Sequence, residues 1–145
     1  MGLSVRRLGR DDADLARTAL RAVYGPELGE PPCEVFLDEP RTHLLVAFDG
    51  EQPVGVAYGY ELPRLLREGT AMLMYEIEVA PLARRRGAGR ALMDRFRTLC
   101  DELGLDSMWL LTDDGNPAAQ ALYRGAGGER HPMDQVMFRF TPRKS

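Results

Sequence analysis

The sequence predicts a mixed α/β fold, in which a mostly antiparallel sheet carries helices on both faces. Between residues 71 and 112, an apolar strand, an amphipathic helix and a second strand follow one another, and such a unit implies a parallel strand pair. Elsewhere, turn signals such as Asp49-Gly50 separate apolar runs as in hairpins, which implies antiparallel pairs.

The N-terminal half is expected to form one helix and several strands. Asp11 is a good N-cap residue, and Gly25-Pro26 stops the helix that follows it. Large and small side chains alternate along the last strand of this half, with Tyr58 and Tyr60 on one face. The predicted elements are a strand at 3–8, a helix at 11–24, a loop at 25–40 with one helical turn at 34–37, and strands at 42–48 and 53–62.

The clearest element of the C-terminal half is a helix over 87–103. Leu92, Phe96 and Leu99 recur there at helical spacing. Gly104 then provides a C-terminal stop. The predicted elements of this half are a strand at 71–79, the helix at 87–103, a buried strand at 107–112, a short helix at 117–125 and a last strand at 135–140.

Length and composition limit the class of protein. The 145 residues suit one domain covering 1–145, and the formal net charge is -3. No apolar run approaches the roughly 20 residues that span a bilayer, and the N-terminus lacks the apolar core of a secretory signal. Cys33 and Cys100 have no metal-ligand spacing, and His43 and His131 are isolated. We therefore expect a cytoplasmic protein with no metal and no membrane partner.

A basic, glycine-rich turn precedes the helix at 87–103. Residues 84–97 contain six arginines and a single aspartate. The first turn of a helix leaves N–H groups unpaired and carries a partial positive charge. Gly87 and Gly89 lack side chains, so an anion such as a phosphate can approach the backbone. On an acidic protein this patch indicates a specific anion rather than nucleic acid, but by itself it also fits a basic capping turn or a nucleic-acid contact.

The pattern of this turn separates it from two common phosphate sites. Gly89 is followed by Arg90 instead of the Lys of a Walker A loop, and Leu92 stands where a dinucleotide site has its third Gly. Arg-x-x-Gly-x-Gly at Arg84 resembles instead the pyrophosphate loop of the GNAT superfamily of acetyl-CoA-dependent N-acetyltransferases. A second stretch at 115–129 resembles that family's Asn-x-x-Ala-x-x-Leu-Tyr-x-x-x-Gly pattern. The matching residues are Arg84, Gly87, Gly89, Asn116, Ala119, Leu122, Tyr123 and Gly127.

This resemblance covers nearly the whole chain and implies both a fold and a cofactor. The GNAT fold is a mixed, mostly antiparallel sheet of about six to seven strands with about four helices and a splayed central parallel pair. Acetyl-CoA lies in the splayed gap, with the Val79 N–H polarising the thioester carbonyl and the basic turn holding the pyrophosphate. The implied acetyl-CoA-binding residues are Ile77, Glu78, Val79, Arg84, Arg85, Arg86, Gly87, Ala88, Gly89, Arg90, Asn116, Ala119 and Tyr123.

The expected reaction is direct attack of a neutral amine on the thioester. A carboxylate should remove the amine proton. Glu76 and Glu78 share one face of their strand, and Glu76 is the first choice for this base, although such a pair is often merely solvated or salt-bridged. Tyr123 corresponds to the family tyrosine that protonates the leaving thiolate; its alternative role is packing of the short helix.

Acidic residues around the expected acceptor site suggest a small polycationic amine. The loop at 25–40 contains five acidic and no basic residues, and Asp113-Asp114 follow the strand at 107–112. Such a basin attracts polycations, although acidic loops also simply maintain solubility. Three stretches, MLMYEIEVAPLARRRGAGRALM, LLTDDGNPAAQALYRGAGGER and VMFRFTP, resemble small aminoglycoside 3-N-acetyltransferases of the GNAT type, with acidic residues at Glu76 and Asp113. One departure is Glu76, which stands where Asp is common. The predicted substrate-binding residues are Glu34, Asp38, Glu76, Glu78, Asp113 and Asp114.

Two other functions remain open at this point. A GNAT enzyme of the same fold could acetylate a polyamine, a protein N-terminus or a lysine. A degenerate relative could bind acetyl-CoA without turnover. Many members of the family are dimers, and a homodimer contact here would use either the strand at 135–140 or the hairpin at 42–62.

Overall fold

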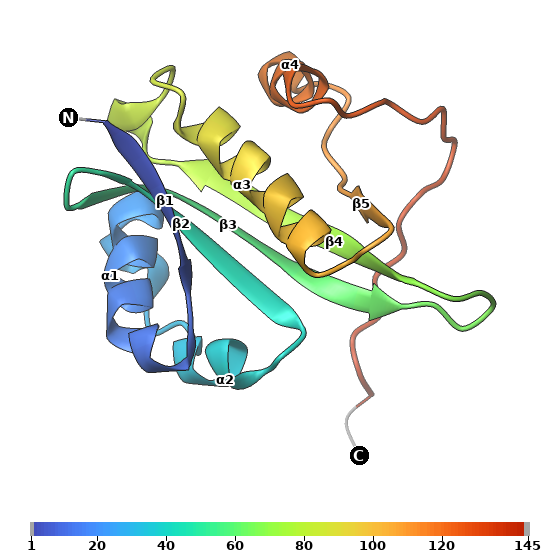
Figure 1. The fold of residues 1–145 in the computed structure, drawn as a ribbon, viewed down its shortest axis with the longest axis horizontal. Helices are drawn as coiled ribbons and strands as arrows, with labels where there is room; N and C mark the ends of the chain where they lie inside the picture. The colour runs from blue at the N-terminus through green and yellow to red at the C-terminus, as the bar shows by residue number, and fades with distance from the viewer. Residues whose placement is uncertain (1, 144–145) are drawn as a thin grey trace.

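The computed structural model describes residues 2–143, and one sheet runs through this part of the chain (Figure 1). The strand order follows the sequence, from β1 at one edge to β5 at the other. The first four strands pair antiparallel, whereas β4 and β5 pair parallel, which confirms the predicted mixed sheet. The strands are β1 (Leu3–Leu8), β2 (Thr42–Asp49), β3 (Gln52–Pro63), β4 (Thr70–Val79) and β5 (Ser107–Trp109).

Helices cover both faces of the sheet. α1 and α2 lie on one face, and α3 lies on the other with α4 beside its N-terminal half (Figure 1). The helices are α1 (Ala13–Tyr24), α2 (Cys33–Asp38), α3 (Ala88–Glu102) and α4 (Pro117–Gly125), with single 3₁₀ turns at Arg10–Asp12, Pro26–Leu28 and Pro81–Ala83. All four helices predicted from the sequence are confirmed, with their ends shifted by a residue or two.

Alternation along β2 creates the two cores. Leu45 and Ala47 belong to the apolar cluster beneath α3, where Phe96 is fully buried. Leu44 and Val46 belong to the cluster beneath α1. Successive side chains of a strand point to opposite faces, so β2 serves both layers. Each large apolar side chain buried in this way contributes about 1.5–3 kcal/mol.

The predicted strand count of six to seven is too high for the described residues, where five strands form. The strand expected at 107–112 ends at Trp109, and the residues expected to be buried in it are not: Trp109 is 43% and Leu111 66% exposed. The segment at 135–140 forms no strand. Apolar and polar side chains alternate in this segment as they do in a strand. A strand forms, however, only where the edge of a neighbouring strand completes the backbone hydrogen bonds.

The buried polar residue of the core is His43, which is 2% exposed. Arg7 approaches its Nδ1 at 2.8 Å, and Glu61 approaches its Nε2 at 2.7 Å. Because an arginine can only donate, Nδ1 accepts and the Nε2–H donates to Glu61. Burial lowers the pKa of His43, which favours this neutral form.

No helix among residues 2–143 has both the length and the apolar character needed to cross a membrane. In the same range, no group of three His, Cys, Asp or Glu side chains is arranged to hold a metal ion.

Candidate active site

The strands β4 and β5 separate after a short common ladder. Their register contains only three pairs, from Ala71↔Ser107 to Leu73↔Trp109. On its other side β4 stays paired with β3 as far as Val79. The C-terminal half of β4 therefore has one backbone edge without a neighbouring strand, which is the predicted splay of the parallel pair. An extended ligand can add to such an edge through main-chain hydrogen bonds.

A β-bulge in β4 decides which of its side chains lie on the α1 face of the sheet. Tyr58 is opposite Glu76, but the next residue of β3, Gly59, is opposite Met74, so Tyr75 is an extra residue without a partner. Bulges of this kind re-aim side chains and occur often beside active sites. Here Tyr75 and Glu76 come to lie on the same face, where Tyr75 stacks on Tyr58 with 5.8 Å between ring centroids. Met74 lies in the core beneath α3, so strict alternation would keep Tyr75 where it is but turn Glu76 to the α3 face.

Glu76 is held by two tyrosine hydroxyls. Tyr24 at the end of α1 donates to Glu76 Oε2 over 2.6 Å, and Tyr58 donates to the same oxygen over 3.2 Å. Burial raises the pKa of both phenols, and the adjacent Glu76 raises it further, so both remain protonated donors. The second oxygen, Oε1, has no hydrogen-bond partner within residues 2–143. One side of this carboxylate is thus fixed while the other is open to an amine.

Aromatic rings line the surface beside Glu76. Phe36 of α2 packs edge-on against Tyr58 and Tyr60, with ring centroids 5.9 and 5.8 Å apart. Tyr60 also meets Tyr75 edge-on at 5.8 Å. Sequence reasoning missed this cluster and Tyr24. The alternation of Tyr58 and Tyr60 was a signal for part of it, but the contribution of α1 and α2 depends on tertiary packing.

Glu78 and Tyr123 lie at the C-terminal end of β4 and on α4. Glu78 pairs with Arg84 over 3.1 Å, and the Arg84 Nε also donates to the Val79 carbonyl over 3.3 Å. Tyr123 is partly buried against the core beneath α3. Burial, and then the charge of Glu78, raise the pKa of Tyr123. A phenol that stays protonated at neutral pH is suited to donate a proton.

The basic turn before α3 contains two residues with left-handed backbone. Gly87 is the N-cap of α3 with φ 89°, and Arg85 is the only non-glycine residue with positive φ in the described chain, at 64°. A left-handed non-glycine residue costs roughly 1–3 kcal/mol, and such strain is concentrated at functional sites. Turns of this kind direct successive N–H groups into a concave anion site. Arg85 and Arg86 have no ion-pair partner within residues 2–143, so their charges are available there.

Two predicted contact residues have a packing role in the structure. A side chain on Gly89 would meet Leu122 of α4 at 3.2 Å, so this glycine permits close packing of α3 and α4. Asn116 is the N-cap of α4, and its Oδ1 accepts from the Ala119 N–H over 3.1 Å. Acetyl-CoA contacts by Gly89, Asn116 and Ala119 remain predictions.

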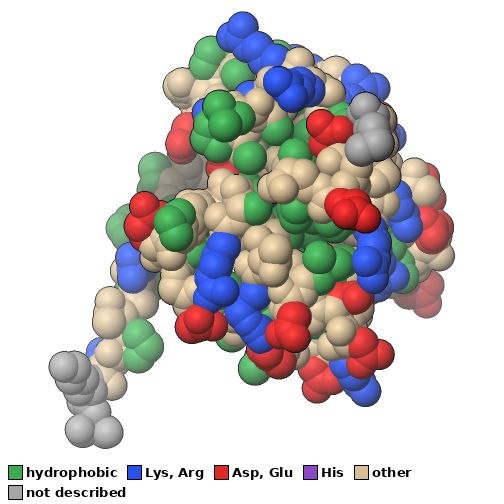
Figure 2. Space-filling view, turned by 90° about the vertical axis from the view of Figure 1, so that its left-hand side faces the viewer, with side chains coloured by type: hydrophobic (Ala, Val, Ile, Leu, Met, Phe, Trp, Pro, Cys, Tyr) green, Lys and Arg blue, Asp and Glu red, His purple; other side chains and the backbone are tan. Residues whose placement is uncertain are grey.

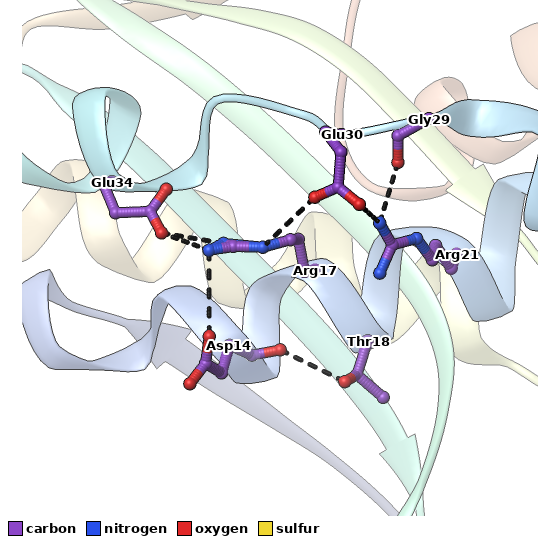
Figure 3. A network of polar contacts seen from close by, with 7 residues as sticks. All are labelled: Asp14, Arg17, Thr18, Arg21, Gly29, Glu30 and Glu34. Atoms are coloured by element: carbon purple, nitrogen blue, oxygen red, sulfur yellow. Dashed lines mark hydrogen bonds and ion pairs between the residues drawn. The ribbon is translucent and has the colours of Figure 1, made fainter.

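Glu30 and Glu34 of the acidic loop at 25–40 form ion pairs with arginines of α1. Figure 3 shows Arg17 between Glu34 and Glu30, and Arg21 between Glu30 and the Gly29 carbonyl. Arg17 keeps only 16% of its side chain exposed. These arginines come from a different element, so the count of acidic residues in the loop alone overstated its local negative charge.

The predicted substrate carboxylates fall into two groups. Glu34, Glu78, Asp38 and Asp114 have arginine partners, the last two through Arg10 at 2.7 Å and Arg130 at 2.9 Å. Glu76 and Asp113 have no such partner within residues 2–143. Exposed ion pairs are worth about 0–1 kcal/mol, so a cationic ligand can displace them. Glu76 and Asp113 are nevertheless the carboxylates that are already available.

Known proteins resemble this chain over most of its length. Residues 13–127 match the Acetyltransferase (GNAT) family. A mycothiol acetyltransferase of Salinispora tropica is 34% identical over 130 residues, which is 83% of this chain and 41% of that protein. A D-amino-acid N-acetyltransferase of Saccharomyces cerevisiae is 28% identical over 123 residues, which is 82% of this chain and 74% of that protein. The chain thus spans less than half the length of the mycothiol acetyltransferases that it matches.

Solved structures share the fold. A crystal structure of an aminoglycoside acetyltransferase from an uncultured soil metagenomic sample, in complex with sisomicin, has a TM-score of 0.84 at 20% identity. The likeness covers 97% of both chains. At this identity the likeness concerns the fold alone. Together with the family match over residues 13–127, these findings confirm the resemblance read from the basic turn and from the stretch after Asn116: the chain belongs to the GNAT acetyltransferase family.

Proposed function

We propose that this chain transfers the acetyl group of acetyl-CoA to an amine of a small cationic molecule, and that this molecule is an aminoglycoside acetylated at its 3-amino group. The observation that carries the proposal is the arrangement of Glu76 beside the open edge of β4. An amine that enters from the aromatic face meets Glu76 Oε1, while an extended thioester can lie along Ile77 and Val79.

Acetyl-CoA is the acetyl donor of the family, and three parts of the chain fit it. The pantetheine arm would add to the unpaired edge of β4, as a further strand would. The pyrophosphate would lie at the N-terminus of α3, where Arg85 and Gly87 shape the turn and the helix dipole favours an anion. Asn116 at the start of α4 would border the thiol end.

The reaction needs one base and one acid. Glu76 would accept the proton of the substrate ammonium and so expose the nitrogen lone pair. The nitrogen then attacks the acetyl carbon, the new C–N bond forms, and the Val79 N–H would stabilise the developing oxyanion. When the C–S bond breaks, the sulfur retains the electron pair and Tyr123 would supply its proton. The acetylated nitrogen then loses its remaining excess proton, which would restore the Tyr123 phenol, and Glu76 would return its own proton to solvent. The products are an acetamide and free CoA.

Several features support an aminoglycoside as the acceptor. Glu76 and Asp113 lack arginine partners among the described residues and can bind ammonium groups. The rings of Tyr58 and Tyr75 offer faces that attract cations. The structural neighbour that binds sisomicin shares the fold over nearly the whole chain.

A second acceptor class is favoured by the pairing of the acidic loop. Because Arg17 and Arg21 compensate Glu30 and Glu34, the loop attracts a polycation less strongly than its composition suggests. The alternative acceptor is then an amine with fewer charges than an aminoglycoside or of another kind: a polyamine, an amino acid, a lysine or a protein N-terminus. The yeast relative is named for D-amino acids.

The direct test is release of CoA thiol from acetyl-CoA with separate acceptors. Gentamicin, sisomicin, spermidine, a lysine peptide and a D-amino acid would each be titrated. The proposal expects the highest kcat/KM with an aminoglycoside, and NMR of the product would then identify the acetylated amine. Turnover confined to another acceptor keeps the acetyltransferase and excludes the antibiotic substrate. Tight CoA binding without release for any amine supports a non-catalytic binding module.

A pair of variants tests whether the carboxylate of Asp113 contributes to substrate binding. Asp113→Asn should raise the KM for the aminoglycoside severalfold while the KM for acetyl-CoA stays unchanged. Asp134→Asn is the matched control, because it removes the same charge from the C-terminal segment outside the sheet. Equal KM values for both variants would exclude Asp113 from substrate binding.

A further inference from the structure

Tyr75 presents an open aromatic face beside the proposed base. As the extra residue of the β4 bulge, it follows Met74 and lies on the same face of the sheet as Glu76. One face of its ring stacks on Tyr58, with 24° between the two ring planes. Even so, 59% of Tyr75 remains exposed, whereas the other rings of the aromatic cluster are partly buried. The ring of Tyr75 is therefore the one that this cluster offers to a ligand.

The open face of Tyr75 is turned away from β3. Both rings that contact it, Tyr58 and Tyr60, belong to β3, so they cover Tyr75 from one side of β4. On the other side of β4, the strand β5 diverges after its last pair, Leu73↔Trp109. The free face of Tyr75 therefore lies on the side of the splay, where the thioester is proposed to lie.

The neighbouring rings hold Tyr75 in place. Tyr60 meets Tyr75 edge-on and packs in the same way against Tyr58, with 6.4 Å between ring centroids. Phe36 of α2 packs edge-on against both rings of β3. Tyr58 is fixed in turn by its hydroxyl, which donates to Glu76. A ring held on several sides loses little conformational freedom when a ligand binds. One residue, Tyr58, thus sets the positions of both the aromatic face and the carboxylate.

Charge by itself discriminates poorly among amines at this site. The acidic residues of the loop at 25–40 are paired with arginines of α1. Figure 2 shows basic and acidic side chains mixed on the side of the molecule where α1 lies. The free oxygen of Glu76 attracts an ammonium group whether a ring or a linear chain carries it. Selection among amines then depends on contacts with the rest of the acceptor.

A flat aromatic face beside a carboxylate fits a saturated ring that carries an amine. The face of an aromatic ring is negative. C–H groups next to an ammonium group are polarised positively, so they are attracted to that face as a cation is. A ring has fewer internal rotations than a linear chain and therefore loses less entropy when it is held against Tyr75.

We propose that Tyr75 is a specificity-determining residue, whose open face binds the ring that carries the reacting amine while that amine lies at Glu76 Oε1. The role of Tyr75 rests on the proposed function, because it concerns the acceptor of the same reaction. It adds a preference that the carboxylates do not provide: an amine on a saturated ring is used better than a linear amine of the same charge.

The test compares two diamines that have the same charge and the same spacing of nitrogen atoms, cis-1,3-diaminocyclohexane and 1,3-diaminopropane. Thiol release with acetyl-CoA should give the higher kcat/KM for the ring diamine. Tyr75→Leu should reduce this preference roughly two- to tenfold, because the aromatic face is lost. Tyr75→Phe is the matched control and should keep the preference, because the ring remains. The CoA Kd and the far-UV spectrum should be the same for all three chains.

Three results would overturn the role of Tyr75. The first is a kcat/KM for the linear diamine that equals or exceeds that for the ring diamine in the unsubstituted chain. The second is an unchanged preference in Tyr75→Leu. The third is an equal loss of preference in Tyr75→Phe, which would assign the effect to the hydroxyl. Turnover of amines in any of these cases still supports an acetyltransferase.

Binding without reaction separates the role of Tyr75 from the proposed function. If no amine releases thiol from acetyl-CoA, calorimetry gives the Kd of each diamine for the chain saturated with CoA. Tighter binding of the ring diamine that is lost in Tyr75→Leu would then support the aromatic subsite, although the proposed function has failed. Equal Kd values, or no binding of either diamine, would overturn the subsite as well.

Discussion

The hydroxyl of Tyr24 donates a hydrogen bond to Glu76 over 2.6 Å, although the two residues are 52 positions apart. The last turn of α1 thereby meets the bulge of β4. A carboxylate that projects from a strand edge has several rotamers, and ordering them costs free energy. The bond from Tyr24 selects one orientation and leaves Oε1 without a hydrogen-bond partner among residues 2–143.

Tyr24→Phe should therefore slow catalysis without weakening acetyl-CoA binding. A hydrogen bond to a charged group is worth about 1.5–3 kcal/mol, and about 1.4 kcal/mol corresponds to tenfold in rate. We expect kcat to fall roughly tenfold, with the KM for acetyl-CoA unchanged, in steady-state thiol-release kinetics. Tyr60→Phe is the control, since its hydroxyl does not contact Glu76. Equal effects of the two variants would mean that Tyr24 has only a packing role.

Glu76→Gln should have a larger effect than any other single substitution on β4. It keeps the size of the side chain but removes the base, and general-base catalysis contributes about 10²–10⁴-fold. We expect kcat to fall by at least about a hundredfold while the Kd for CoA from calorimetry stays within twofold. Glu78→Gln is the matched comparison, because Glu78 is paired with Arg84. If Glu78→Gln loses more activity than Glu76→Gln, the base is Glu78.

Tyr123→Phe tests the proposed proton donor through its pH profile. Burial, and then the charge of Glu78, raise the pKa of Tyr123, which keeps the phenol protonated throughout the neutral and mildly alkaline range. Loss of the hydroxyl should lower kcat on the order of a hundredfold, by a constant factor between pH 6 and 9. A loss that varies with pH in this range would contradict a donor that stays protonated.

His43 should make folding stability depend on pH. Burial lowers the pKa of His43, an effect that the charge of Arg7 adds to and that Glu61 opposes. The unfolded chain, with a His pKa of about 6.5, then binds a proton at a pH where the folded chain does not. The contribution of neutral His43 to folding stability is complete above pH 6.5. It declines as the pH falls from there toward the lowered pKa of His43 in the folded chain.

The measurement for this prediction is Tm between pH 7.5 and 5.5. The unsubstituted chain should lose Tm steadily below pH 6.5. His43→Gln should have a lower Tm at pH 7.5, because the substitution disturbs the contacts with Arg7 and Glu61. Its Tm should then fall less steeply as the pH is lowered. Parallel curves would assign the pH dependence to other groups.

The helices were predictable from the sequence because their signals are local. α3 begins after Gly87 and is followed by Gly104, and α4 begins at Pro117 after its Asn116 cap. These residues act within one turn of the backbone, so no knowledge of the rest of the fold is needed. The position of Gly87 at the start of α3 followed from the same local rules.

The features that escaped prediction depend on distant partners. The bulge at Tyr75 appears only in the register with β3, and the compensation of Glu34 requires Arg17 from another helix. The segment at 135–140 alternates like a strand, yet alternation cannot say which edge is available to it. The carboxylates of the proposed acceptor face were therefore readable from the sequence, whereas the aromatic residues beside them were not.

Tyr75 is the extra residue that the bulge inserts into β4, because it has no partner on β3. Before it, even-numbered side chains such as Met74 belong to the core beneath α3; after it, even-numbered side chains such as Glu76 face the acceptor. Loss of one residue within a strand normally turns all later side chains to the wrong face. Removing Tyr75 would instead restore regular alternation and leave Glu76 and Glu78 where they are. Deletion of Tyr75 would thus remove one ring from the aromatic cluster without changing the register of the rest of β4.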